Sequence, residues 1–361
     1  MTIKPGAIRF NTDSMKLEIF RGSANYEGSA SMAGIGTLAA GQWEEIQATS
    51  PEVQTGGTRG VFWGSISPNP LAERKQIDYI NVDSTGNSQD FGDSIDGGIR
   101  AACGSRTRGL CAGAYNSHPT ADTIDFITYS STGDATDFGN LVGQYYSAAG
   151  LSNSTRGVWT GGTTSAASVS GSQNTIQYVT IASTGDAVDF GDLINKKSTS
   201  ASFNSQTRGI IAGGYSVPSN ARINEIEYIE TATLGNGADF GDLSTTSGFN
   251  NSMQGCNSVR AVIALGNVVA APATQCVNTV EYFTMSTLGN SQDFGDVSTA
   301  SEFLTAASSS TRCVWHINAG QGGDGDKLEY VQIMTTGNGV DFGDCTERQR
   351  TSGCSNGHGG L

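Results

Sequence analysis

Two charged residues recur at regular intervals along the sequence and are the first candidates for chemistry. One is an Arg that follows Thr or Val, at Arg59, Arg108, Arg156, Arg208, Arg260 and Arg312. The other is the Asp of an Asp-Phe-Gly triplet, at Asp90, Asp137, Asp189, Asp239, Asp293 and Asp341. Six copies of each favour structural ion pairs or capping hydrogen bonds repeated along the chain. A ring of Arg that binds an anion in a central channel is the functional alternative.

The other candidates for catalysis or metal binding stand alone. Asp-Phe-Gly is also the metal-binding tripeptide of protein kinases, but no phosphate-binding loop and no His-Arg-Asp motif accompany it here. Asp324 and Asp326 resemble a fragment of a Ca²⁺-binding loop whose other ligands are missing, which favours a solvated turn. No Ser-His-Asp order or shared metal site can be built from the three His residues, His118, His316 and His358. We therefore expect no enzyme activity, no cofactor and no metal site.

Composition excludes several classes of protein. With 20 Lys and Arg against 34 Asp and Glu, the net charge is −14, so nucleic-acid binding is not expected. There is no run of about 18 apolar residues that would insert into a membrane. The start, MTIKPG, lacks the apolar core of a signal peptide, so we expect a chain made in a cytoplasm and not exported by the usual route. Among the seven Cys, Cys103 and Cys354 occupy equivalent repeat positions, which favours buried packing over disulfides or metal binding.

The dominant feature of the sequence is one segment that is written six times. The copies read IDYINVDSTGNSQDFGD from Ile77, IDFITYSSTGDATDFGN from Ile124, IQYVTIASTGDAVDFGD from Ile176, IEYIETATLGNGADFGD from Ile226, VEYFTMSTLGNSQDFGD from Val280 and LEYVQIMTTGNGVDFGD from Leu328. Their intervals are 47, 52, 50, 54 and 48 residues. Each copy predicts an apolar strand, a tight turn containing Gly, and a second strand that buries the Phe of Asp-Phe-Gly. An apolar segment beginning with Thr-Arg-Gly or a variant precedes each copy and predicts another buried strand.

Each repeat therefore predicts four strands, which we name a to d: a polar strand a, then b (Thr-Arg-Gly), c (Ile-x-Tyr) and d (Asp-Phe-Gly). Four-stranded sheets repeated radially form a β-propeller. The first repeat lacks strand a, and the segment after the last strand d matches that position. We predict an all-β fold in which residues 51–361 form six four-stranded blades, with roughly residues 347–357 completing the first blade and leaving no open edge. The strand order and the Gly-Gly after strand b resemble the kelch family over residues 58–357, although the Trp that usually follows strand c is absent and Phe takes its packing role.

The two faces of such a propeller differ in variability. The a–b and c–d links are short and repeated, whereas the b–c loops differ in length and sequence. Loops on a rigid scaffold often carry function. We therefore predict a binding face at the b–c loops, with candidate residues Arg74, Lys75, His118, Asn220, Arg222, Asp324 and Asp326. Both ends of the propeller are expected on the opposite face.

Residues 1–50 lie outside the repeat and predict a small β-hairpin segment. PGAIRFNTDSMKLEIFRG reads as two short strands joined by a polar turn, and GQWEEI follows further along. This segment is similar to one that recurs in phage tail and fibre proteins, although the stretch between Phe20 and Trp43 is longer here. The resemblance implies that the N-terminal segment docks on a virion as an anchor and that the protein is a symmetric homo-oligomer. The anchor residues would be Ile8, Arg9, Phe10, Asn11, Asp13 and Trp43. A generic hairpin appended to a propeller is the alternative.

Together these features predict a virion structural protein of the tail-fibre or appendage type. Residues 1–50 would contact other virion proteins, and the propeller would bind a host-surface receptor or glycan. Two alternatives remain open: a purely structural capsid-decoration or tail-connector protein, and a glycan-active enzyme on a propeller fold. A cluster of carboxylates about 5–10 Å apart on the b–c face would favour the enzyme, and the sequence alone indicates no such cluster.

Overall fold

The computed structural model describes residues 7–11, 16–21, 42–45, 56–68, 71–114, 121–164, 171–217, 219–248, 252–253, 255–270, 273–317 and 325–361. These residues form strands, turns and irregular segments. No helix in the described part of the chain is long and apolar enough to cross a membrane. The chain divides into two compact units, Met1–Pro51 and Glu52–Leu361.

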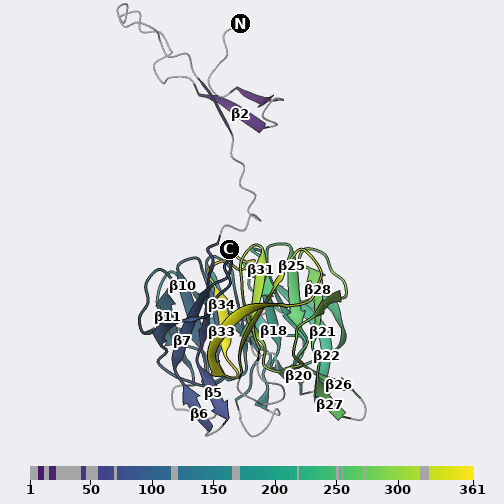
Figure 1. Cartoon of the computed structure of the whole chain (residues 1–361). Coiled ribbons are helices and arrows are strands. Elements are labelled where there is room, and N and C mark those ends of the chain that lie inside the picture. Colours follow the sequence, from purple (N-terminus) through teal and green to yellow (C-terminus); the bar gives the residue numbers. More distant parts are fainter. Residues whose placement is uncertain are drawn as a thin grey trace, which may run out of the picture. The chain divides into compact units, whose positions relative to one another are not determined.

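The larger unit is a six-bladed β-propeller, as the repeat predicts (Figure 1). Each blade is an antiparallel sheet of four strands in the order a-b-c-d. Strands a lie innermost and contact one another across blades. From blade 1 to blade 6 they are β34 (Ser352–Ser355), β9 (Ala101–Gly104), β13 (Ala149–Ser152), β18 (Ala201–Asn204), β24 (Gly255–Cys256) and β30 (Thr305–Ser308). Strands b are β4 (Arg59–Trp63), β10 (Arg108–Ala112), β14 (Arg156–Thr160), β19 (Arg208–Ala212), β25 (Arg260–Ala264) and β31 (Arg312–Ile317).

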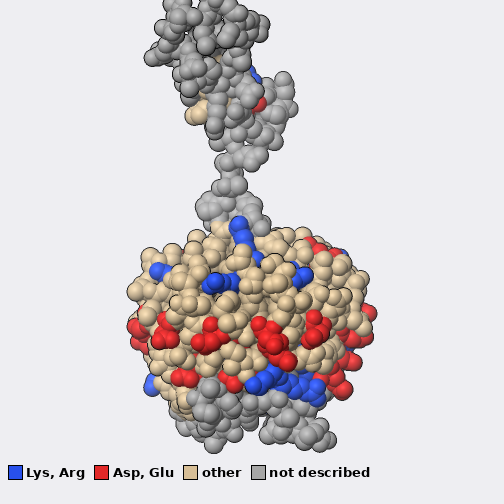
Figure 2. Space-filling view, turned by 90° about the vertical axis from the view of Figure 1, so that its left-hand side faces the viewer, with Lys and Arg blue, Asp and Glu red and all other residues tan. Residues whose placement is uncertain are grey.

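The repeated segment forms the outer half of every blade. Strands c are β7 (Gln76–Asn81), β11 (Thr123–Thr128), β15 (Thr175–Thr180), β21 (Ala221–Glu230), β28 (Thr279–Thr284) and β32 (Gly325–Gln332). Strands d are β8 (Gln89–Asp93), β12 (Thr136–Asn140), β16 (Val188–Asp192), β22 (Ala238–Ser247), β29 (Gln292–Asp296) and β33 (Val340–Arg348). Exposed Asp side chains on strands d contribute to the band of carboxylates around the middle of the propeller in Figure 2.

Short extra strands decorate the end of the propeller that carries the b–c loops, which we call the b–c face. The b–c loops of blades 1 and 5 form the hairpins β5 (Ser65–Pro68) with β6 (Leu71–Arg74) and β26 (Asn267–Ala270) with β27 (Ala273–Cys276). In blade 4, β20 (Tyr215–Ser216) pairs with β17 (Lys197–Ser198) and β21, while β23 (Ser252–Met253) pairs with β18. The opposite end carries the a–b and c–d turns, and we call it the a–b face.

The ring closes through residues from the far end of the sequence. Strand β34 pairs antiparallel with β4, so that Cys354 lies opposite Val61 in the first blade. This confirms that a segment within residues 347–357 supplies the missing strand a. The C-terminus lies at the opposite end of the propeller from the β5–β6 and β26–β27 hairpins (Figure 1).

The Phe of each Asp-Phe-Gly triplet is buried, as predicted. Each ring is no more than 3 % exposed and packs edge-on against the aromatic ring of strand c in the same blade, with centroids 5.8–6.2 Å apart. Burying one Phe side chain contributes about 1.5–3 kcal/mol. The six are Phe91, Phe138, Phe190, Phe240, Phe294 and Phe342.

The c–d turn also clamps each blade to the one before it. The Gly amide in the turn donates to the Phe carbonyl of the preceding Asp-Phe-Gly, for example Gly133 to Phe91 at 2.7 Å, and the six such bonds span 2.7–3.0 Å. The next side chain, Asp134 in blade 2, accepts a hydrogen bond from the Asp93 amide at 2.9 Å. A Cβ on Gly92 would lie 2.5 Å from the Gly133 carbonyl, so this close approach requires Gly. The clamp recurs at all six junctions, including the closing one between Phe342 and Gly86.

The smaller unit holds a three-stranded antiparallel sheet in the order β1-β2-β3, formed by β1 (Ile8–Asn11), β2 (Lys16–Arg21) and β3 (Gln42–Glu45). Arg9 lies opposite Glu18 and forms an ion pair with it at 2.8 Å. Trp43 lies opposite Phe20. The predicted hairpin is therefore extended by a third strand that contains Trp43.

Candidate functional site

The recurrent Arg residues hold adjacent blades together. Each guanidinium carbon lies 4.2–4.8 Å from the centroid of the strand-c aromatic ring in its own blade. Each Nη1 also donates to a backbone carbonyl of the following blade, as Arg108 does to Ile181 at 2.9 Å. The Asp residues of Asp-Phe-Gly are exposed on strand d, and none of the ion pairs between described residues joins them to these Arg. The Arg are structural, but they bond to carbonyls and rings rather than forming the expected ion pairs.

The propeller axis is filled at the a–b face by the last residues of the chain. His358 is fully buried, donates from Nε2 to the Gly104 carbonyl at 2.9 Å, and accepts from the Gly360 amide at Nδ1. Burial lowers the pKa of His358 to about 4, so the ring is neutral. A Cβ on Gly360 would lie 2.2 Å from the Ser152 carbonyl, and Leu361 is fully buried. The recurrent Arg therefore do not line an open channel at this face.

On the b–c face, we group five residues under the name Arg222 cluster: Arg222, Asn267, Glu302, Phe303 and Arg350. Asn267 Nδ2 donates to Glu302 Oε2 at 2.8 Å, and both side chains are buried. The Arg350 guanidinium lies 4.0 Å from the centroid of the Phe303 ring. Burial lowers the pKa of the half-buried Arg222, and the negative charge of Glu302 opposes that shift.

Four d–a links on the b–c face have an unusual backbone, and two of them contribute residues to this cluster. Phe303 and Arg350 have φ values of 60° and 58°, in the left-handed region that non-Gly residues rarely adopt. Ser147 and Thr199 have φ values of 54° and 58°. All four lie two residues before an innermost strand, on the d–a links of the b–c face. Such conformations persist only where the surrounding structure enforces them, and they concentrate at functional sites.

The predicted b–c residues are distributed over several blades. Asn220 and Arg222 belong to one blade-4 hairpin, where Tyr215 pairs with Arg222 and its hydroxyl donates to the Asn220 carbonyl at 2.9 Å. In blade 1, Arg74 ends β6, and the exposed Lys75 donates to the Ile95 carbonyl. In blade 6, Asp326 is exposed at the start of β32. The two remaining candidates, His118 and Asp324, lie outside the described residues.

The predicted anchor residues lie in the three-stranded sheet of the smaller unit. Ile8, Arg9, Phe10 and Asn11 make up β1, and Ile8 is 61 % exposed. Trp43 lies in β3. Asp13 lies outside the described residues.

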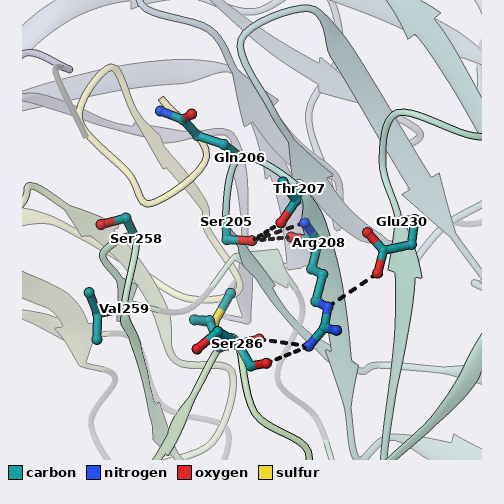
Figure 3. A pocket seen from close by; sticks show the side chains of 9 residues that line it. Ser205, Gln206, Thr207, Arg208, Glu230, Ser258, Val259 and Ser286 are labelled. Atoms are coloured by element: carbon teal, nitrogen blue, oxygen red, sulfur yellow. Dashed lines mark hydrogen bonds and ion pairs between the residues drawn. The ribbon is translucent and has the colours of Figure 1, made fainter. Parts of the chain in front are cut away.

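The a–b face carries pockets between successive blades. The one between blades 4 and 5 has a volume of about 370 Å³ and is lined by Ser205, Gln206, Thr207, Arg208, Glu230, Ser258, Val259, Met285 and Ser286 (Figure 3). Arg208 Nε donates to Glu230 at 3.2 Å, and its Nη1 donates to the Ser286 carbonyl at 3.0 Å. A pocket of about 310 Å³ occupies the corresponding place between blades 1 and 2, beside Arg59. No site was predicted on this face from the sequence.

A set of buried polar and acidic side chains on strands c was also not predicted from the sequence. The residue after the first apolar residue of strand c is no more than 2 % exposed in every blade: Asp78, Asp125, Gln177, Glu227, Glu281 and Glu329. Asp125 is paired with the buried Arg100, whose Nη1 donates to it at 2.9 Å. Asp78 is paired with Arg348 at 2.8 Å, and Glu227 with Lys197. Arg100 and Lys197 come from d–a links and Arg348 from the end of β33, so the pairs join neighbouring blades.

Among the described residues, no group of three or more His, Cys, Asp and Glu side chains could hold a metal ion. Comparison with known protein families and with curated proteins finds no match to this chain.

Proposed function

We propose that this protein is a virion appendage that displays its propeller for binding to a host-surface receptor or glycan through the b–c face. The Arg222 cluster carries the proposal. It combines Arg side chains and a buried carboxylate on the face with the variable loops. The resemblance of residues 1–50 to phage tail and fibre segments supports an anchoring role, and the kelch-like strand order supports a display scaffold.

The position of the chain ends in the propeller fits this arrangement. Gly57 donates to the Asn356 carbonyl, so the start of the propeller and its closing segment meet at the a–b face. The described chain therefore enters the propeller at the a–b face, at the opposite end from the b–c loops.

Binding of the full-length chain to host cells and to arrayed surface glycans tests the proposal. Arg222→Ala and Arg350→Ala should each weaken binding about ten-fold or more, because each removes a charged hydrogen-bond donor. Arg106→Ala is the matched control, since this exposed Arg lies on the a–b face. The protein would instead be a purely structural component if it binds no host surface and if neighbours bury its b–c face in the intact particle. Hydrolysis of an arrayed glycan would establish the enzyme.

A further inference from the structure

The pocket between blades 4 and 5 departs from its counterparts at two positions. Val259 takes the place of a Thr that precedes the recurrent Arg in every other blade: Thr58, Thr107, Thr155, Thr207 and Thr311. Glu230, which pairs across strands with Arg208, takes the place of neutral polar residues: Asn81, Thr128, Thr180, Thr284 and Gln332. The six blades therefore form an internal comparison in which this pocket alone combines a carboxylate with an apolar side chain at these positions.

Neither departure is needed to hold the blades together. Arg208 stacks on the Tyr228 ring and bonds to the Ser286 carbonyl, and the other recurrent Arg make the same stack and bond with no carboxylate at the cross-strand position that Glu230 occupies. The Arg208 and Glu230 side chains are 22 % and 47 % exposed, and an ion pair this open contributes about 0–1 kcal/mol. Val259 is 48 % exposed, so it gains little from burial. Binding of a ligand would account for both Glu230 and Val259.

The lining selects a class of ligand. Arg208 and Glu230 form an ion pair without net charge that offers one donor group and one acceptor group, which suits a neutral partner. Adjacent hydroxyl groups can donate to the carboxylate and accept from the guanidinium, while Val259 offers an apolar surface to C–H groups. The volume of about 370 Å³ is at the lower end of the range for ligand pockets. Figure 3 shows Arg208 and Glu230 on one side of the pocket, with Ser258 and Val259 across from them.

We propose that this pocket binds one sugar unit of a neutral glycan. The site lies on the a–b face, so it is additional to the Arg222 cluster and independent of the function proposed for the b–c face.

The test uses the full-length chain with methyl glycosides of glucose, galactose and N-acetylglucosamine, followed by saturation-transfer NMR. At least one neutral glycoside should bind, with a Kd on the order of 1 mM as expected for so small a ligand. The double variant Glu230→Thr/Val259→Thr restores the residues found in other blades and should therefore fold. It should weaken binding about ten-fold or more, because one hydrogen-bonding group and one apolar contact are lost.

The matched control is Arg106→Ala/Thr107→Ser, which alters the corresponding pocket between blades 1 and 2 and should leave glycoside binding unchanged. Failure of all three neutral glycosides to bind, or equal binding by the double variant, overturns this inference. The inference is also overturned if Arg222→Ala abolishes glycoside binding and the double variant does not. That result would leave the b–c face proposal in place. If only Arg222→Ala loses cell binding and only the double variant loses glycoside binding, both sites are supported.

Discussion

The hydrogen-bonded clamp between blades predicts that two Gly→Ala substitutions with similar backbone strain will lower the free energy of unfolding by different amounts. Gly92 and Gly133 lie on opposite sides of one junction, with φ values of 143° and 149°. In this region an Ala costs about 1–3 kcal/mol in backbone strain. A Cβ on Gly133 meets nothing within 4 Å, whereas a Cβ on Gly92 lies 2.5 Å from the backbone carbonyl of Gly133. Gly92→Ala must therefore also separate the two blades locally.

The additional cost follows from the bonds at that junction. The Gly133 and Ala135 amides donate to the carbonyls of Phe91 and Asp93 at 2.7 and 2.8 Å, and Asp134 accepts from the Asp93 amide at 2.9 Å. Each hydrogen bond contributes about 0.5–1.5 kcal/mol, so loss of all three adds about 1.5–4.5 kcal/mol.

Chemical denaturation of the two variants and the wild type measures this difference. Gly92→Ala should unfold at a clearly lower denaturant concentration than Gly133→Ala, which should itself lie modestly below the wild type. Equal midpoints for the two variants would refute the clamp as a stabilising contact. A change in the slope of the transition would show instead that unfolding is no longer a single cooperative step.

Three further predictions concern buried groups. Burial lowers the pKa values of His316 and His358 to about 4, so the unfolded chain takes up protons below about pH 6.5 while the folded chain does not. Stability should fall as pH drops from about 6.5 toward 4, by up to about 3 kcal/mol per His, and His358→Gln should flatten the measured dependence of the unfolding free energy on pH. Six of the seven thiols are buried and Cys276 is partly exposed. One thiol per folded chain should therefore react with a disulfide reagent, and the others only in denaturant. Reaction of a second thiol in the folded chain would contradict this prediction. Arg100→Met should cost about 3–5 kcal/mol by leaving Asp125 buried and unpaired, and Arg100→Met/Asp125→Leu should recover part of that loss in equilibrium unfolding.

The repeat in the sequence was sufficient to predict the blades, because each strand and turn recurs with its own apolar pattern. The closing strand was predictable too, since the first repeat lacks a strand that the last segment could supply. Contacts between blades were not predictable, because the repeat does not show which groups of adjacent copies meet. The Gly92 and Gly133 contact is of this kind: both Gly were recognised as turn or triplet residues, but not as partners.

Contacts made by residues outside the repeat were even harder to predict from the sequence. Arg100, Lys197 and Arg348 neutralise equivalent acids on strands c, yet they stand at different distances after Asp-Phe-Gly, so no spacing pattern connects them. On the b–c face, Arg222 was predicted from its variable loop. Glu302 and Arg350 were missed because they belong to d–a links, for which no candidate residues were predicted.

The ring closure also determines how the propeller would respond to mechanical force. The chain passes from Gly57 directly into β4, which is hydrogen-bonded to β34 on one side and to β7 on the other. A pull on this strand directed away from the a–b face would act along its length and load both rows of hydrogen bonds together in shear. A strand at the edge of a blade could instead be peeled away one bond at a time. Pulling through β4 should therefore meet more resistance than pulling through a strand d, which has hydrogen-bonded strand neighbours on one side only.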